Sequence, residues 1–296
     1  MTTPPSYHPF KGALLFILAL FFFTCQDTTT KYLSIHYKVP FIAAIRYIVN
    51  CLLMMIILLP TQGKKLLQTQ RTRWVILRAA CLPFITLFIG LALQRMPVAE
   101  TTAISFLAPM LVILIARPIL GERIGILGWI ASLTGFAGVL LIVRPSSNLD
   151  HTGIIYVLCA VVASAAYQLL SRVLISTERA VVMLFYTTLM GSICFGVCLP
   201  WYWSGRVPDL RELLLLLSLG ITGGLGHFLF TSAYQHAQAS LLAPITYLQL
   251  LWAGLLGWLV FGHVPDRLSV IGMCVVTASG ILITLRSRQS PSLTKQ

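Results

Sequence analysis

Ten long apolar stretches make up most of the 296-residue chain, and they constrain the fold more than any other feature. A helix needs about 20 apolar residues to cross the hydrocarbon core of a bilayer. The stretches are continuous rather than alternating, which favours helices over a membrane barrel. The sequence therefore predicts an all-α membrane protein with ten transmembrane helices, at roughly residues 12–33, 40–60, 73–94, 98–116, 124–144, 153–174, 179–200, 212–234, 240–261 and 268–286.

The composition and the distribution of charge agree with a membrane protein. Only 10% of the residues are charged, whereas a soluble domain carries about 25%. The net charge of +13 does not indicate nucleic-acid binding, because the basic residues gather in the connections between stretches, where the positive-inside bias places them. The basic segment 61–73 predicts a cytoplasmic loop, and ten spans then put both termini in the cytoplasm.

The sequence lacks the motifs of hydrolysis and of metal chemistry. It contains no G-x-x-x-x-G-K-[ST], no G-x-S-x-G and no H-E-x-x-H. Its seven cysteines all lie inside apolar stretches, with neither a C-x-x-C nor a Cys/His cluster. We therefore expect no ATP hydrolysis by this chain, no cofactor and no metal site.

The second half of the sequence repeats the first at an offset of 141 residues, and this offset aligns Gly12 with Gly153, Lys31 with Arg172, Ala92 with Ala233 and Gln94 with Gln235. The repeat predicts a lead at 1–11, five-helix repeats at 12–145 and 153–286, and a tail at 287–296. Five spans per repeat is an odd number, so we expect the halves to be inverted. Such pairs place a substrate site near the midplane, between the repeats.

Matching irregular residues in the two halves are the best sequence indication of that site. Pro83 lies near the middle of the third stretch, and its repeat partner is Gly224 in the eighth. Proline removes a backbone hydrogen bond, and glycine allows close approach of backbones. We interpret both positions as helix interruptions, with a kink or ordinary close packing as the alternative.

Two opposite charges are predicted at the same depth in the membrane. Asp27 lies about six residues before the end of the first stretch, and Arg46 about six after the start of the second, so both are ~9 Å below one surface. An ion pair between them is expected, either as a structural tie or as part of a substrate site. The neighbours Gln26, Tyr47 and Asn50 favour a polar cavity there.

Other polar residues inside the stretches are candidates with ordinary alternatives. Glu100 is either a charge at a helix N-terminus or a group that binds a coupling proton or cation. Arg78 is expected to snorkel towards the cytoplasmic surface. The second half offers further cavity candidates, each of which is also explained as an interface anchor or a core residue: Tyr167, Gln168, Tyr186, His227, Tyr247, Gln249 and Trp252.

Several segments carry a resemblance to one family: QDTTTKYLS at 26–34, IRYIVN at 45–50, TAISFLAPMLVILIARPILGERIG at 102–125 and APITYLQLLWAGLLGWLVFGHVPD at 243–266. The chain resembles the EamA family of the drug/metabolite transporter superfamily, and its layout is similar to S-adenosylmethionine uptake members. It departs from the family where a second Gly-Glu would stand, at Gly262-His263.

The resemblance implies a non-ATP transporter that moves a small polar metabolite across the bacterial inner membrane by alternating access. The implied partners are the substrate, the bilayer, and a coupling proton or other ion. A second copy of the chain, forming a homodimer, is a further candidate partner. Two other classes fit the sequence less well. A membrane-embedded enzyme would need a catalytic cluster or long loops, and an assembly or sensor subunit has no need of two interchangeable halves.

Overall fold

A computed structural model describes residues 9–108, 110–112, 115, 126–143, 149–174, 177–236 and 245–289. Within these ranges the chain is helical apart from its connections, and no strand occurs. The elements are α1 (Pro9–Leu33), α2 (Val39–Gln62), the 3₁₀ helix η1 (Gly63–Leu66), α3 (Thr72–Arg95), α4 (Val98–Ser105), α6 (Ile126–Val143), α7 (His151–Leu174), α8 (Ala180–Tyr202), α9 (Leu210–His236), α11 (Leu248–Phe261) and α12 (Arg267–Gln289).

The helices confirm a multi-pass membrane protein. Six described helices are long and apolar enough to cross a bilayer, and four shorter apolar helices accompany them. Large apolar side chains such as Ile56, Ile57 and Trp201 are exposed on the outside of the bundle, as expected for a surface that faces lipid. The number of complete crossings, ten from the sequence, stays a prediction.

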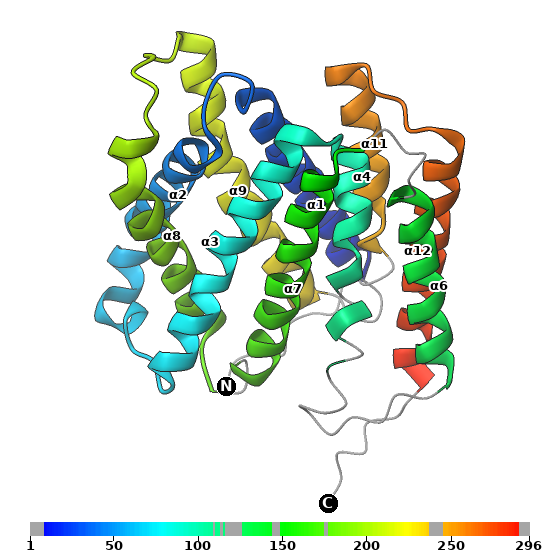
Figure 1. The fold of residues 1–296 in the computed structure, drawn as a ribbon. Helices are drawn as coiled ribbons and strands as arrows, with labels where there is room; N and C mark the ends of the chain where they lie inside the picture. The colour runs from blue at the N-terminus through cyan, green and yellow to red at the C-terminus, as the bar shows by residue number, and fades with distance from the viewer. Residues whose placement is uncertain are drawn as a thin grey trace, which may run out of the picture.

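Helices from the two halves pack against each other throughout the bundle (Figure 1). Helix α1 packs along α9, and α7 packs along α3. The 141-residue offset relates α1 to α7 and α9 to α3, so these two contacts are equivalent. Helix α2 also packs on α8, and α6 on α12, which pairs corresponding helices.

The connections gather at two ends of the bundle, which we call upper and lower as they stand in Figure 1. The upper end holds residues 34–38, 96–97, 149–150, 203–209 and 262–266, and the lower end holds 63–71 and 177–179. Helix α1 ends and α12 begins at the upper end. The N-terminus of α1 and the C-terminus of α12 therefore point to the lower end.

The structure does not contain the helix interruptions that the sequence predicted at Pro83 and Gly224. Helices α3 and α9 run through both positions without a break. A proline inside a helix removes one hydrogen bond and can be accommodated locally in a membrane bundle. Gly224 instead permits a close contact with α2, described below.

Candidate functional site

A guanidinium–amide contact lies at the centre of the upper half of the bundle. Arg46 of α2 donates from Nη1 and Nη2 to the side-chain oxygen of Gln26 on α1, at 2.8 and 2.9 Å, with the amide oriented so that its oxygen faces the arginine. The expected direct ion pair with Asp27 is not formed. Successive helical residues point about 100° apart, so only one of Gln26 and Asp27 can face the guanidinium squarely.

Asp27 and Arg46 nevertheless line one small cavity, whose wall also includes Thr30, Thr86 and Gly90. Its volume is about 20 Å³, which is room for about one water molecule. Pockets for metabolites and other small ligands enclose about 300–1,000 Å³. The described residues therefore leave room here for a water molecule but not for a metabolite.

Helix α9 approaches the same cluster through its glycines. A Cβ on Gly223 would lie 2.7 Å from the Gln26 amide, and one on Gly224 would lie 3.2 Å from Oδ1 of Asn50. The Tyr47 hydroxyl lies 2.8 Å from Thr86 Oγ1, which ties α2 to α3. Of the predicted residues, the structure thus brings together Gln26, Asp27, Arg46, Tyr47, Asn50 and Gly224.

A second guanidinium is buried in the lower half, where the sequence suggested snorkelling. Arg78 of α3 is only 6% exposed. It donates to Tyr167 Oη at 2.6 Å and Ser171 Oγ at 2.7 Å on α7. On α8 it reaches Thr187 Oγ1 at 3.2 Å and the carbonyl of Met183 at 3.3 Å. The expectation for Arg78 is wrong, because α7 and α8 cover the path to the surface.

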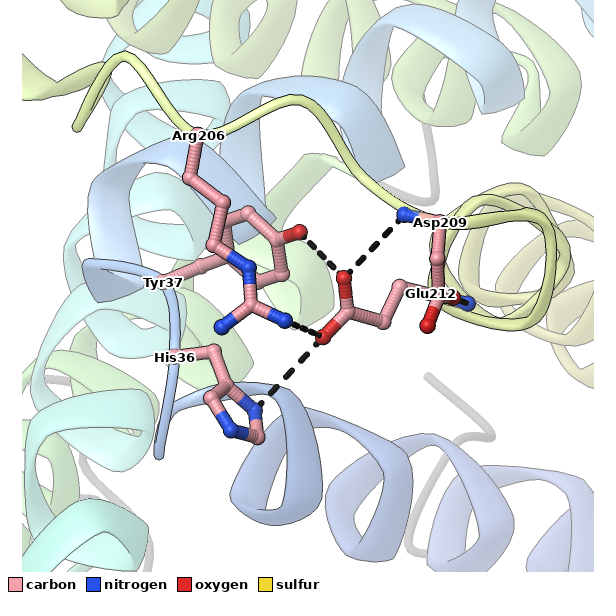
Figure 2. A network of polar contacts seen from close by, with 5 residues as sticks. All are labelled: His36, Tyr37, Arg206, Asp209 and Glu212. Atoms are coloured by element: carbon pink, nitrogen blue, oxygen red, sulfur yellow. Dashed lines mark hydrogen bonds and ion pairs between the residues drawn. The ribbon is translucent and has the colours of Figure 1, made fainter.

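A polar network closes the upper end, and Figure 2 shows it. The buried carboxylate of Glu212, near the start of α9, accepts from Tyr37 Oη at 2.6 Å and from Arg206 Nη2 at 2.7 Å. His36 Nδ1 lies 3.7 Å from the same carboxylate. Burial and the bond to Glu212 raise the pKa of Tyr37 to about 12, so its hydroxyl stays a donor at neutral pH.

A corresponding contact lies at the lower end, beside an open hollow lined by residues 70–74. Oε1 of the buried Glu178 accepts from the backbone N–H groups of Gln70 and Arg71, at 2.9 and 2.6 Å, just before α3. The 141-residue offset relates Tyr37 to Glu178 and Arg71 to Glu212. The upper contact 37–212 and the lower contact 71–178 are therefore equivalent under the repeat, with the carboxylate on opposite members.

Glu100, in the first turn of α4, contacts the second half of the chain. It is 2% exposed, and its Oε1 lies 3.0 Å from Nε2 of the partly exposed His263. Its other oxygen is buried without a hydrogen-bond partner in the described structure. Lys31 on α1 caps the end of α3 by donating to the carbonyls of Leu93 and Met96, within electrostatic reach of Glu100.

Most of the remaining predicted residues lie apart from the central cluster, but His227 on α9 is within electrostatic reach of Arg46 and Arg78. The Tyr186 hydroxyl donates to the carbonyl of Leu67 at the lower end. Three rings pack on aromatic neighbours, His227 on Phe23, Tyr247 on Phe106 and Trp252 on Phe21. Gln168 and Gln249 are half-buried on α7 and α11. Glu122, in the segment 102–125 that carries part of the family resemblance, lies outside the described residues.

Sequence reasoning missed Arg78, Glu178 and Glu212 as parts of this arrangement. The repeat offset was a usable signal for the two glutamates, because it pairs the loop at 37 with 178 and the helix start at 71 with 212. Nothing in the sequence alone gave the burial of Arg78, which depends on how α7 and α8 pack.

Polar clusters on either side of a closed, lipid-facing bundle, built by two equivalent halves, define the chain as a membrane transporter. The profile of the EamA-like transporter family matches it twice, at residues 10–144 and 151–285. The chain belongs to this family. The prediction of a small-metabolite transporter rather than an enzyme is thereby confirmed.

Curated relatives carry several transporter names. The S-adenosylmethionine uptake transporter of Rickettsia bellii is 27% identical, over 94% of each chain. The riboflavin transporter of Vibrio cholerae is 26% identical, over 94% of each chain. A pseudopaline exporter of Pseudomonas aeruginosa is 28% identical, over 93% of this chain and 96% of its own.

A solved crystal structure shares the fold. It has a TM-score of 0.65 and 18% identity, and the match covers 94% of this chain and 98% of that one.

Proposed function

We propose that this chain carries an amino-acid-like metabolite across the bacterial inner membrane by alternating access, with ten spans in two inverted halves. The lower end and both termini face the cytoplasm, and the upper end faces outwards. The packing of α1 on α9 and of α7 on α3 supports the inversion. The basic segment 61–73 at the lower end supports the orientation.

The observation that carries this proposal is that equivalent contacts close both ends at once. The upper contact joins Tyr37 to Glu212, and the lower contact joins Glu178 to the start of α3. Between them the polar cavity holds only about 20 Å³. This arrangement is that of an occluded state, from which release of either contact opens one side.

The substrate class follows from the central cluster. A guanidinium, a carboxylate and two amides meet there, from Arg46, Asp27, Gln26 and Asn50. This set suits a molecule with both an acidic and a cationic group. The relatives named for S-adenosylmethionine uptake support an amino-acid-like compound, and the similar riboflavin transporter makes another polar metabolite the alternative.

Energy comes, in this proposal, from a coupling proton held by Glu100 and His263. Glu100 is buried and has one oxygen free of hydrogen bonds within the described residues, while His263 is partly exposed at the upper end. A buried ionisable group in a membrane bundle is a functional candidate by default. The pair also joins the two halves, so its protonation can affect their contact.

Sided labelling tests the mechanism. Cysteine reporters replace two buried residues, Ala43 beside the cavity and Val75 near the lower end, in protein without its seven native cysteines. Glu212→Gln should increase labelling of the reporter at 43 by an impermeant reagent from the upper side. Glu178→Gln should increase labelling of the reporter at 75 from the lower side.

The control is Asp150→Asn, which removes an exposed ion pair with Arg95 at the upper end and should leave both reporters protected. Each glutamine retains the shape of the glutamate, so general unfolding is not the expected cause of labelling. Equal labelling from both sides in either glutamine variant would contradict the assignment of one contact to each end.

A further inference from the structure

The charge of Arg78 is unbalanced by any carboxylate within the described part of the chain. Its hydrogen-bond partners are two hydroxyls on α7, one on α8 and a backbone carbonyl, all of them neutral. Placing a charge inside a membrane bundle is costly, and such groups pair with one another or with backbone carbonyls. The ring of Tyr167, whose centroid lies 4.2 Å from the guanidinium carbon, adds a cation–π contact but no negative charge. A partner that arrives from outside the chain would supply that charge.

Arg78 and Arg46 contact corresponding parts of the two repeats, although they are not repeat partners of each other. The offset relates Gln26 to Tyr167 and Arg46 to Thr187. The guanidinium of Arg46 contacts Gln26, and that of Arg78 contacts both Tyr167 and Thr187. Each half of the bundle therefore holds one guanidinium at corresponding places, supplied by α2 above and by α3 below.

The two places differ in charge. The upper guanidinium shares its cavity with Asp27, whereas the residue equivalent to Asp27 in the lower half is the neutral Gln168. The residue equivalent to Arg78 is Leu219, which is apolar and fully buried. The lower place thus carries an excess positive charge that the upper place does not.

We propose that Arg78 and Tyr167 form a second substrate site, in the lower half of the bundle, which binds the carboxylate of the transported molecule. The planar guanidinium fork matches a carboxylate with two parallel hydrogen bonds. The hydroxyls of Ser171 and Thr187 hold the fork in place until the carboxylate displaces the longer contacts, those at 3.2 and 3.3 Å.

This inference rests on the proposed transport function and adds a path to it. Arg46 lies seven residues from the upper end of α2, and Arg78 six from the lower end of α3. Helices α2 and α3 have 24 residues each and are about 36 Å long, so the Cα atoms of Arg46 and Arg78 are separated by roughly 15 Å along the bundle. A substrate then passes its carboxylate from Arg46 to Arg78 as access changes from the upper to the lower end.

Sided competition in membrane vesicles of both orientations tests the site. The probe is radiolabelled S-adenosylmethionine, and the competitors are unlabelled S-adenosylmethionine and its decarboxylated analogue. From the lower face the wild type should prefer the carboxylate-bearing competitor by about 10- to 100-fold, the usual worth of a charged hydrogen bond. Arg78→Gln should abolish that preference at the lower face. The preference for the carboxylate-bearing competitor at the upper face should remain.

Tyr167→Phe is a second variant, because it keeps the guanidinium and removes one hydroxyl, and it should reduce the lower-face preference. Arg95→Gln is the matched control, since it removes another arginine of α3 that lies exposed beside Asp150. If Arg78 only ties helices together, its loss would weaken both competitors and both faces equally, and that result would overturn the proposal.

A transport-independent measurement separates this site from the proposed function. Purified wild-type protein should gain thermal stability with millimolar methionine but not with methioninol, which has an alcohol in place of the carboxylate. Arg78→Gln should gain less stability with methionine than the wild type does, because only the guanidinium of Arg46 remains to bind the carboxylate, and an unchanged gain would overturn the second site. Absence of S-adenosylmethionine flux in the wild type would count against the proposed substrate class only. Equal shifts with methionine and methioninol, or no shift with either, would overturn the carboxylate site.

Discussion

At the scale of single residues, the charged groups inside the bundle differ in what balances them. Arg46 has an amide and a nearby carboxylate. Arg78 has three hydroxyls and the ring of Tyr167, and Glu100 has an imidazole. These surroundings assign separate tasks to the three residues. In the proposed mechanism, Arg46 and Arg78 bind the substrate, and Glu100 with His263 binds the proton.

The task of Glu100 gives a prediction about energy coupling. Glu100→Gln keeps the size and the contact with His263 but cannot take up a proton. In proteoliposomes it should therefore lose the accumulation of S-adenosylmethionine that an imposed pH gradient drives, and lose much less of the exchange at equal pH. Measuring flux of the labelled compound under both conditions gives the separate losses of driven accumulation and of exchange.

Other charged groups near Glu100 also influence how the flux depends on pH. Lys31 of α1 lies within electrostatic reach, while Arg95 of α3 is bonded to Asp150, and Asp266 holds the start of α12 at Ser269. Asp150→Asn is the control, because it removes a carboxylate at the same end without touching Glu100. Accumulation that Glu100→Gln leaves at the wild-type level would exclude this group as the coupling site.

At the scale of helices, the approach of α9 to α1 and α2 depends on residues without side chains. The space that a Cβ on Gly223 would occupy is taken by the Gln26 amide, which Arg46 holds in place. The helix thereby presses the binding residues into one small volume. Movement of α9 relative to α1 would enlarge that volume and release Gln26.

We predict that Gly223→Ala raises the KM for transport by about 10- to 100-fold, because small displacements of positioning groups can cost this much. Gly254→Ala on α11 is the matched control, since a Cβ there meets no atom within 4 Å. Both changes add the same methyl group to an apolar helix. Equal KM values for the two variants, at equal amounts in the membrane, would contradict a positioning role for the α9 glycine.

At the scale of the whole molecule, the class and the duplication could be predicted from sequence, because the lengths of apolar stretches and a constant offset do not depend on side-chain packing. The partner of Arg46 could not, since whether Gln26 or Asp27 faces it depends on helix rotation. Likewise, the prediction that Arg78 snorkels considered only its own helix. Packing of α7 and α8 over that residue keeps it buried. The supposed interruption at Pro83 was wrong because one missing hydrogen bond does not end a helix of 24 residues.

The orientation of the whole bundle gives the last prediction. Segment 61–73 is basic and lies at the lower end, to which α1 and α12 also point their free ends. Positive-inside bias then predicts that this end faces the cytoplasm. A cysteine at the exposed position of Gln68 should react with an impermeant reagent only in inside-out vesicles, and one at Ile35, which is exposed at the upper end, only in intact cells. The reverse pattern would keep the two closing contacts but exchange their sides, so that Arg78 would meet substrate from outside the cell.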